Sequence, residues 1–235
     1  MTVHVHLVRH GEIASHQGDV PLTEFGIKEV QDEGRKMGEN LTENEKLFFL
    51  YASTNRTRQT AEKFQKGILE SVEKYQLKNI AVHEPVTETA IRNPDIFLGG
   101  LRVEMVSSAK ALSEQTYSVG LKASHLETVP FWPDFWNSPD RIGYWLGLEN
   151  PPGENANAVA RRIMTFASSL NSLPIKGSHR YVCVTHSPVL RAFLNRFLLE
   201  EDPGEPEYCE SIDLYFKDEN TCTIRFRKVE KTISI

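Results

Sequence analysis

Short apolar runs alternate along this chain with longer segments that have helical character. Residues 3–8, 47–52 and 181–185 are strand-length runs rich in β-branched and aromatic residues. Each run is followed by a segment whose apolar spacing and composition predict a helix. The three predicted helices cover residues 23–40, 55–72 and 188–198.

The predicted helices begin at recognisable start signals. Thr23 is a favourable N-cap for the first helix, and residues 53–55 supply three candidate caps for the second. Ser187 is the predicted N-cap of the third helix. Pro188 then occupies the first helical position, where its missing N–H would have no partner anyway. These signals give the chain a repeated strand–turn–helix order.

This repeated order predicts an α/β fold. Strands joined by helices form a mainly parallel sheet covered on both faces, so we expect a three-layer α/β/α sandwich. Residues 208–216 and 221–229 are expected to complete the sheet, the second as an antiparallel C-terminal strand after a turn at residues 217–220. Open sheets of this kind bind ligands at the carboxyl ends of their strands. The segments that follow the three apolar runs should therefore meet at one rim.

Residues 93–150 interrupt the alternation of strands and helices. They include an aromatic, proline-rich stretch at residues 131–136 and a Tyr-Trp pair at residues 144–145. Long irregular segments in compact domains are often lids over functional sites. We expect one domain over residues 1–235 with a lid-like insertion at about residues 93–150, whose aromatic side chains mainly form the core of the insertion itself.

Composition and charge describe an ordinary globular chain. The 235 residues are 40% hydrophobic and 25% charged, and the formal net charge of −5 does not favour nucleic acid or a membrane as the partner. The three cysteines (Cys183, Cys209 and Cys222) are odd in number and form no Cys-x-x-Cys pair, which favours a reducing compartment. No apolar run approaches the roughly 20 residues that span a bilayer, and no signal peptide precedes the first strand. We therefore expect a cytoplasmic protein, and no feature predicts its oligomeric state.

The residues that follow the three apolar runs are suited to phosphoryl transfer. A metal-free site for this slow reaction needs an in-line nucleophile, several cationic donors for the phosphoryl oxygens and an acid for the leaving oxygen. His10 can attack as an imidazole, and Arg9 and Arg56 can each donate two parallel hydrogen bonds to a phosphate. His186 and Ser187 lie at a predicted helix start, where the helix dipole and free N–H groups favour an anion. These residues are predicted to form an anion cage around the nucleophile.

Several short motifs support this chemistry by their order along the chain. They are Leu7-Val8-Arg9-His10-Gly11-Glu12, Pro21-Leu22-Thr23-x-x-Gly26, Arg56-Thr57-Arg58-Gln59-Thr60-Ala61-Glu62, Pro152-Gly153-Glu154 and Thr185-His186. With these motifs the chain resembles the histidine phosphatase superfamily, the phosphoglycerate mutase-like proteins, although Asn155 stands where the family has serine in a Gly-Glu-Ser motif. The resemblance implies a phosphoglycerate mutase-like fold. We expect the site to need no metal or cofactor. It also implies His10 as nucleophile, with Arg9, Arg56 and His186 holding the phosphoryl group.

The proton donor is predicted from its position in the sequence. Glu88 lies downstream of the arginine helix and before the insertion, which is where the family's proton donor is found, and we favour it over Glu84. The donor must be protonated near neutral pH to assist the leaving oxygen.

The residues after the first motif favour a phosphatase over a mutase. Mutases of the family continue the motif with Ser, Trp and Asn, whereas this chain has Ile13, Ser15 and His16 at those positions. His16 is accordingly predicted to contribute to substrate specificity. We expect a metal-independent phosphoric monoester hydrolase that acts on a small phosphorylated metabolite. A cofactor-dependent phosphoglycerate mutase is the main alternative, and a catalytically weak binding or scaffolding module of the same fold is the second.

A metal-dependent hydrolase of the barrel type is a further alternative, because His4 and His6 form a His-x-His pair on the first predicted strand. No later set of His and Asp residues at strand ends supports it, and the chain is short for a barrel of about 250 residues. We expect both histidines to pack against a helix instead.

Overall fold

The computed structural model describes residues 2–15 and 18–235 and has a mixed β-sheet at its centre. The strands are β1 (Val3–Arg9), β2 (Glu45–Tyr51), β3 (Ala81–Val82), β4 (Val86–Thr87), β7 (Ser178–Thr185), β8 (Ser211–Phe216), β9 (Thr221–Phe226) and β10 (Val229–Ser234). They lie in the order β10-β9-β8-β1-β7-β2-β3, and β4 also pairs with β2. The neighbouring strands β1, β7, β2, β3 and β4 pair in parallel. β8 pairs antiparallel with β1. β9, at residues 221–226, pairs antiparallel with β8, so the prediction of a mainly parallel sheet with an antiparallel C-terminal strand is confirmed. β8 and β10 are antiparallel to their neighbours as well, which was not predicted.

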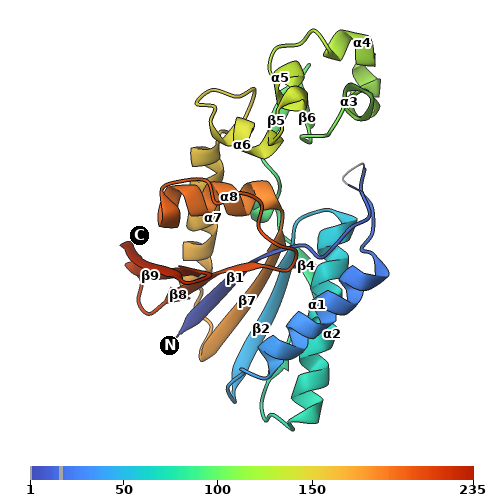
Figure 1. The fold of residues 1–235 in the computed structure, drawn as a ribbon. Helices are drawn as coiled ribbons and strands as arrows, with labels where there is room; N and C mark the ends of the chain where they lie inside the picture. Colours follow the sequence, from blue (N-terminus) through green and yellow to red (C-terminus); the bar gives the residue numbers. More distant parts are fainter. Residues whose placement is uncertain (1, 16–17) are drawn as a thin grey trace.

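Four helices cover the two faces of the sheet. In Figure 1, α1 (Glu24–Gly38) and α2 (Asn55–Lys74) lie on one side, and α7 (Ala156–Asn171) and α8 (Ser187–Leu194) lie on the other. A π-helical turn, η3 (Asn195–Leu199), continues α8. The fold is thus the predicted α/β/α sandwich.

Alternate residues of β1 enter two separate hydrophobic clusters. Val5 and Leu7 are fully buried in the cluster that contains side chains of α7 and α8. Val8 instead joins Phe49 in the cluster beneath α1 and α2. Because successive side chains of a strand point to opposite faces, a strand covered on both sides needs apolar residues in both registers. This requirement explains why the central strands were recognisable as nearly continuous apolar runs.

Helices α1 and α2 pack against each other through glycine. A Cβ atom on Gly34 of α1 would lie 2.3 Å from the carbonyl oxygen of Phe64 on α2, so no other residue fits without moving a helix. The glycine that weakens the helical pattern in the sequence is therefore required by the contact between the helices. Both helices still lie within two residues of their predicted limits at residues 23–40 and 55–72.

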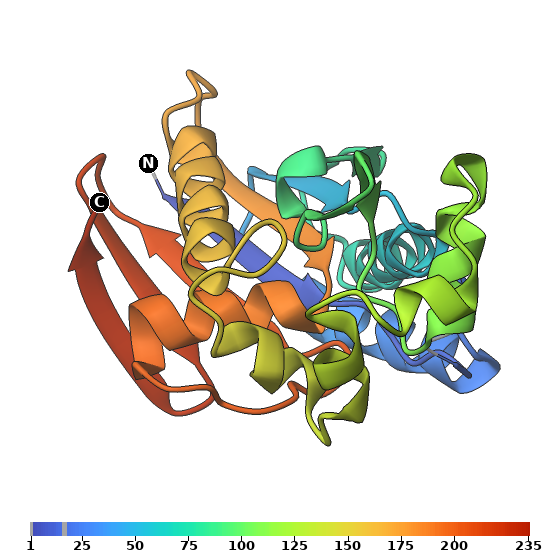
Figure 2. The same cartoon turned by 90° about the horizontal axis from the view of Figure 1, so that it is seen from above.

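The predicted insertion consists of small elements beyond the carboxyl ends of the parallel strands (Figures 1 and 2). They are the hairpin of β5 (Ile96–Leu98) and β6 (Leu101–Val103), and the short helices α3 (Ala109–Gln115), η2 (Tyr117–Val119), α4 (Ala123–Leu126), α5 (Trp132–Asn137) and α6 (Arg141–Leu146). Trp132, Phe135 and Trp145 are almost completely buried. The aromatic stretch thus packs into a hydrophobic core, as expected from its composition.

Short or polar strands account for most differences from the predicted elements. β3 and β4 have two residues each, and β10 is mostly exposed and carries Glu230 and Lys231, so none of the three has an apolar run. The strand predicted at residues 208–216 begins at Ser211. Among the helices of the described part of the chain, none is both long and apolar enough to cross a bilayer.

Candidate active site

The parallel pairing of β1 with β7 brings two distant histidines to the same edge of the sheet. Arg9 lies opposite Thr185 in the strand register. The backbone N–H of His10 donates to the carbonyl oxygen of Thr185 at 3.1 Å. The ring centroids of His10 and His186 are 5.4 Å apart, with an interplanar angle of 66°. The two rings are therefore neighbours at the strand ends, where a sheet of this kind presents its ligand site.

A cavity of about 470 Å³ lies at this edge of the sheet. Five predicted site residues line it: Arg9, His10, Arg56, His186 and Ser187. The insertion contributes the opposite wall, with Asn93, Met105, Val106, Ser107, Phe135, Pro139, Asp140, Arg141 and Ile142. Of the other two predicted residues, Glu88 is not part of the cavity wall, and His16 lies outside the described residues. The structure thus brings together the nucleophile candidate and every predicted phosphate-binding residue.

The hydrogen bond of the His10 ring determines which nitrogen can act as a nucleophile. Nδ1 lies 2.9 Å from the carbonyl oxygen of Gly11. A carbonyl can only accept, so Nδ1 carries the proton and donates, and in the neutral ring the lone pair is on Nε2. The backbone N–H of Gly11 donates in turn to Oγ1 of Thr60 on α2 at 3.0 Å, which holds this loop against the helix.

The second motif holds the loop that follows His10. Oγ1 of Thr23 donates to the Glu12 carboxylate at 2.8 Å and accepts from the backbone N–H of Gly26 at 2.9 Å. A Cβ atom on Gly26 would lie 2.6 Å from the carbonyl oxygen of Glu12. Thr23 is therefore the N-cap of α1, as predicted, and it also supports the nucleophile loop.

Arg56 brings a largely buried positive charge to the cavity. It lies in the first turn of α2, and its only ion pair within the described residues is a long one, 3.7 Å from Nη1 to Oδ1 of Asp19. Its Nε is buried and has no hydrogen-bond partner there. Burial lowers the pKa of the Arg56 guanidinium, and the negative charge of Asp19 opposes this change. The guanidinium still carries its charge at neutral pH, so the cavity contains a cation that an anionic ligand can neutralise.

His186 is held as a neutral base beside the cations. Its side chain is buried, and Nδ1 has no hydrogen-bond partner among the described residues. Burial lowers the pKa of His186 well below its usual value, and the charges of Arg56 and Arg9 act in the same direction. A bound phosphate would replace the missing partner and reduce the surrounding positive charge.

Ser187 differs from its predicted role at the start of α8. The N-cap of the helix is His186, and Ser187 is the first helical residue. The Ser187 hydroxyl donates to Oε2 of Glu205 at 2.7 Å rather than capping the helix. The helix therefore begins one residue earlier than predicted. His186 has the extended backbone angles of an N-cap, and Ser187 is already helical.

Arg9 is enclosed by a loop that the sequence did not single out. Its Nη2 forms an ion pair with Oε1 of Glu205 at 2.7 Å, and its Nη1 donates to the carbonyl oxygen of Pro206. The Tyr208 ring lies 4.2 Å from the guanidinium carbon, a cation–π contact. Nε is buried and has no partner among the residues described.

Glu88 follows a strand that pairs in parallel with β2, but it lies outside the cavity wall. It follows β4 and is half-buried, and its carboxylate accepts from the backbone N–H of Ala90 at 2.8 Å. That bond makes Glu88 the N-cap of a short 3-10 helix, η1 (Thr89–Ile91). To reach a leaving group in the cavity, the carboxyl would have to leave this cap.

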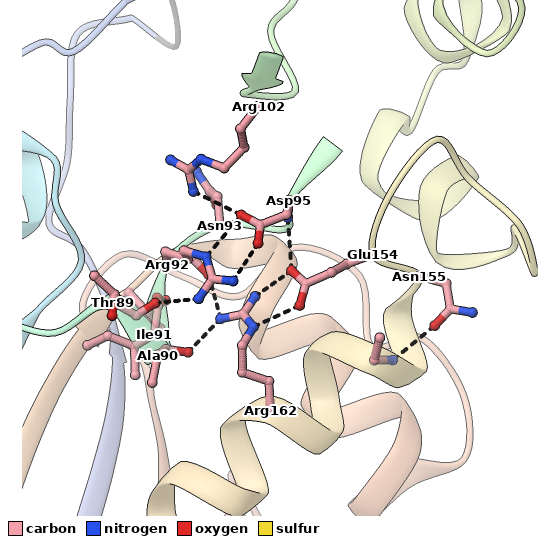
Figure 3. A network of polar contacts seen from close by, with 12 residues as sticks. Thr89, Ala90, Ile91, Arg92, Asn93, Asp95, Arg102, Glu154, Asn155 and Arg162 are labelled. Carbon is pink, nitrogen blue, oxygen red and sulfur yellow. Dashed lines mark hydrogen bonds and ion pairs between the residues drawn. The ribbon is translucent and has the colours of Figure 1, made fainter. Parts of the chain in front are cut away.

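A polar network joins the segment after Glu88 to α7 and to both ends of the insertion (Figure 3). Arg162 on α7 donates twice to the Glu154 carboxylate, at 2.9 Å each, and once to the carbonyl oxygen of Arg92 at 3.2 Å. Glu154 also accepts from the backbone N–H of Asp95 at 2.9 Å. The glutamate of the fourth motif thus fixes the base of the insertion and lies outside the cavity wall.

Arg191 forms a second link between the insertion and the core. This fully buried side chain of α8 forms ion pairs with Asp140 of the insertion and with Asp202 in the loop before β8. The carboxylates raise the pKa of Arg191 against the effect of burial. Sequence reasoning missed this residue because it lies within an apolar helical run, where nothing local indicates ionic partners.

The His-x-His pair of β1 lies away from the cavity. His6 Nδ1 is 2.7 Å from Oδ1 of Asp213 on β8, and the His4 ring packs edge-on against Tyr215 at 4.7 Å. Both partners belong to the neighbouring strand β8. His6 also lines a second cavity together with Lys36 and Met37 of α1. No group of three or more His, Cys, Asp and Glu side chains within residues 2–15 and 18–235 is arranged to hold a metal ion.

Comparisons with known proteins agree with the fold and the first motifs. Residues 5–84, which contain Arg9, His10 and Arg56, match the family model of the histidine phosphatase superfamily (branch 1). No curated protein sequence matches the chain.

Solved structures share the fold at low sequence identity. A mycobacterial glucosyl-3-phosphoglycerate phosphatase is 16% identical over 92% of each chain, with a TM-score of 0.54. The phosphoglycerate mutase from Bacillus anthracis is 14% identical over 100% of this chain and 92% of that chain, with a TM-score of 0.53. A protein described as mycobacterial hydrolase 1 is 16% identical over 100% of both chains, with a TM-score of 0.55. Residues 5–84 thus match the histidine phosphatase superfamily, and the whole chain has the fold of the phosphatase and the mutase to which it is structurally similar.

Proposed function

We propose that the protein is a metal-independent phosphatase that hydrolyses a small phosphate monoester through a phosphohistidine intermediate on His10. The observation that carries the proposal is the arrangement in the cavity wall. His10 carries its nucleophilic lone pair on Nε2, and Arg9, Arg56 and the neutral His186 line the same cavity. These groups supply both the nucleophile and the donors that a dianionic phosphoryl group requires.

The reaction proceeds in two displacements. Nε2 of His10 attacks phosphorus while the ester oxygen leaves with a proton from the carboxyl of Glu88, which leaves its cap on η1 to reach the cavity. Water then attacks the phosphohistidine and gives a proton to the Glu88 carboxylate, which releases inorganic phosphate and restores the lone pair on His10. Arg56, Nε of Arg9 and the N-terminal end of α8 stabilise the charge that the phosphoryl oxygens carry in both transition states.

Hydrolysis is preferred over mutase activity because of the segment after His10. Mutases of the family have Ser and Trp where this chain has Ile13 and Ser15. Ile13 is buried, and its backbone forms an isolated bridge with Leu22. Its apolar side chain supplies no hydrogen bond to a sugar-acid substrate.

The proposal is tested by following phosphate release from an aryl phosphate, and by following interconversion of 2- and 3-phosphoglycerate with and without a bisphosphorylated primer. We expect phosphate release that vanadate inhibits and EDTA does not, together with no interconversion. Interconversion faster than phosphate release would support the mutase instead. Loss of phosphate release in EDTA would contradict the metal-independent mechanism, and the absence of both activities would favour the binding module.

Glu88→Gln is expected to slow hydrolysis of an alkyl phosphate about 10²-fold, because an alkoxide leaving group needs a proton from a general acid. Hydrolysis of an aryl phosphate should slow much less, since a phenolate leaves more readily. Glu84→Gln is the matched control, because Glu84 is exposed and carries the same charge on the same segment. If both variants hydrolyse the alkyl ester at the same rate, Glu88 is not the acid.

A further inference from the structure

One carboxylate already occupies the anion cage. Glu205 lines the same cavity as His10 and His186. Its Oε1 lies 2.7 Å from Nη2 of Arg9, and its Oε2 accepts from the Ser187 hydroxyl at 2.7 Å. Glu205 thus contacts two of the groups that were predicted to hold phosphate.

These contacts use part of the donor set of Arg9 that a phosphate would need. Nη2 is bound to Glu205 and Nη1 to the carbonyl oxygen of Pro206, which leaves Nε and one N–H on each Nη atom. A phosphate that binds Arg9 through two parallel hydrogen bonds requires at least one Nη atom. Such a phosphate would therefore either displace the Glu205 carboxylate or lie directly against its negative charge.

Glu205 is placed so that its carboxylate can move away from Arg9 and Ser187. Its side chain is 49% exposed, and it lies in the loop between η3 and β8. Gly204, immediately before it, has a φ of 75°, a conformation that glycine adopts without strain. Nη1 of Arg191 lies 3.6 Å from Oε2 of Glu205, so a second cation is within reach of the displaced carboxylate.

We propose that Glu205 is an internal competitor for the phosphate site, which occupies Arg9 and Ser187 in the resting enzyme and is displaced when a phosphoryl group binds. The competition weakens the binding of inorganic phosphate and so favours release of the product of the proposed hydrolysis, on which this inference rests. The opposite role is a positioning one, in which Glu205 stays in place and holds Arg9 ready for phosphate. The two roles predict opposite effects on affinity when the charge of Glu205 is removed.

The test is calorimetric titration of the whole protein with inorganic phosphate. Removing the charge should tighten binding about tenfold in Glu205→Gln and in Glu205→Ala, because a like charge no longer competes for Arg9. Glu207→Gln is the matched control, since Glu207 is exposed in the same loop and does not line the cavity. We expect its affinity for phosphate to equal that of the parent.

Equal or weaker phosphate binding by both Glu205 variants, or no binding by either, would overturn the inference. Phosphate release from an aryl ester is measured on the same samples, which separates this result from the proposed function. Tighter phosphate binding without any ester hydrolysis would support the competition and reject the hydrolase. Normal hydrolysis with unchanged phosphate affinity would reject the competition alone.

Discussion

His10→Ala is expected to lower the rate of phosphate release by roughly 10⁴-fold or more, because removal of a covalent nucleophile leaves only binding and charge stabilisation. Nε2 of His10 carries the lone pair because Nδ1 donates to the Gly11 carbonyl. The other histidine of the cavity wall, His186, is buried at the start of α8. The remaining cations still line the cavity in the variant. Inorganic phosphate should therefore still bind, and the loss should fall on kcat.

The control for this substitution is His125→Ala. His125 is an exposed residue of α4 in the insertion and does not line the cavity. Its replacement should leave both kcat and KM unchanged. Equal rates for His10→Ala and the parent would show that the hydrolysis does not use this histidine.

Arg56→Ala is expected to lower kcat/KM roughly 10²- to 10³-fold, which is the usual effect of removing one donor that stabilises transition-state charge. Arg56 is largely buried, and its only ion pair within the described residues is 3.7 Å long, so its charge is available to the phosphoryl group. Vanadate inhibition should weaken in parallel, because vanadate uses the same donors.

Arg58→Ala provides a matched control on the same helix. Arg58 is exposed and pairs with Glu62 at 2.8 Å, and its side chain does not reach the cavity wall. Both substitutions remove one positive charge from α2, so a general electrostatic effect would appear in both. A similar loss in the two variants would contradict a specific role for Arg56.

The central elements were predictable because their burial leaves a strong pattern. β1, β2 and β7 are covered on both faces and appear as apolar runs, and α1 and α2 begin at threonine caps or cap-rich turns. β10 was missed because most of its residues are exposed and no apolar pattern remains. The shift of the α8 N-cap from Ser187 to His186 has a similar origin, since Ser187 has a stronger local propensity but a tertiary partner in Glu205.

The predicted site residues share one property, which is a position just after a parallel strand. Arg9 is the last residue of β1 and His10 follows it. Arg56 lies in the helix after β2, and His186 follows β7, so the topology alone brings them to one rim. Glu205 follows no strand, and its approach to Arg9 depends on the path of a loop.

Glu88 shows the limit of prediction from position. It lies between α2 and the insertion, where it was sought, yet its carboxylate caps η1 instead of lining the cavity. The hydrogen bond to Ala90 that holds it there depends on the local turn, which the sequence pattern did not indicate.

The most direct test of the account is to trap the phosphoenzyme. The protein is mixed with a radiolabelled phosphate ester, quenched within one turnover in alkali, digested and analysed for labelled peptides. We expect a label that is stable in alkali, labile in acid and attached to His10, and that is absent from His10→Ala. A label on another residue, or full turnover by His10→Ala, would contradict it.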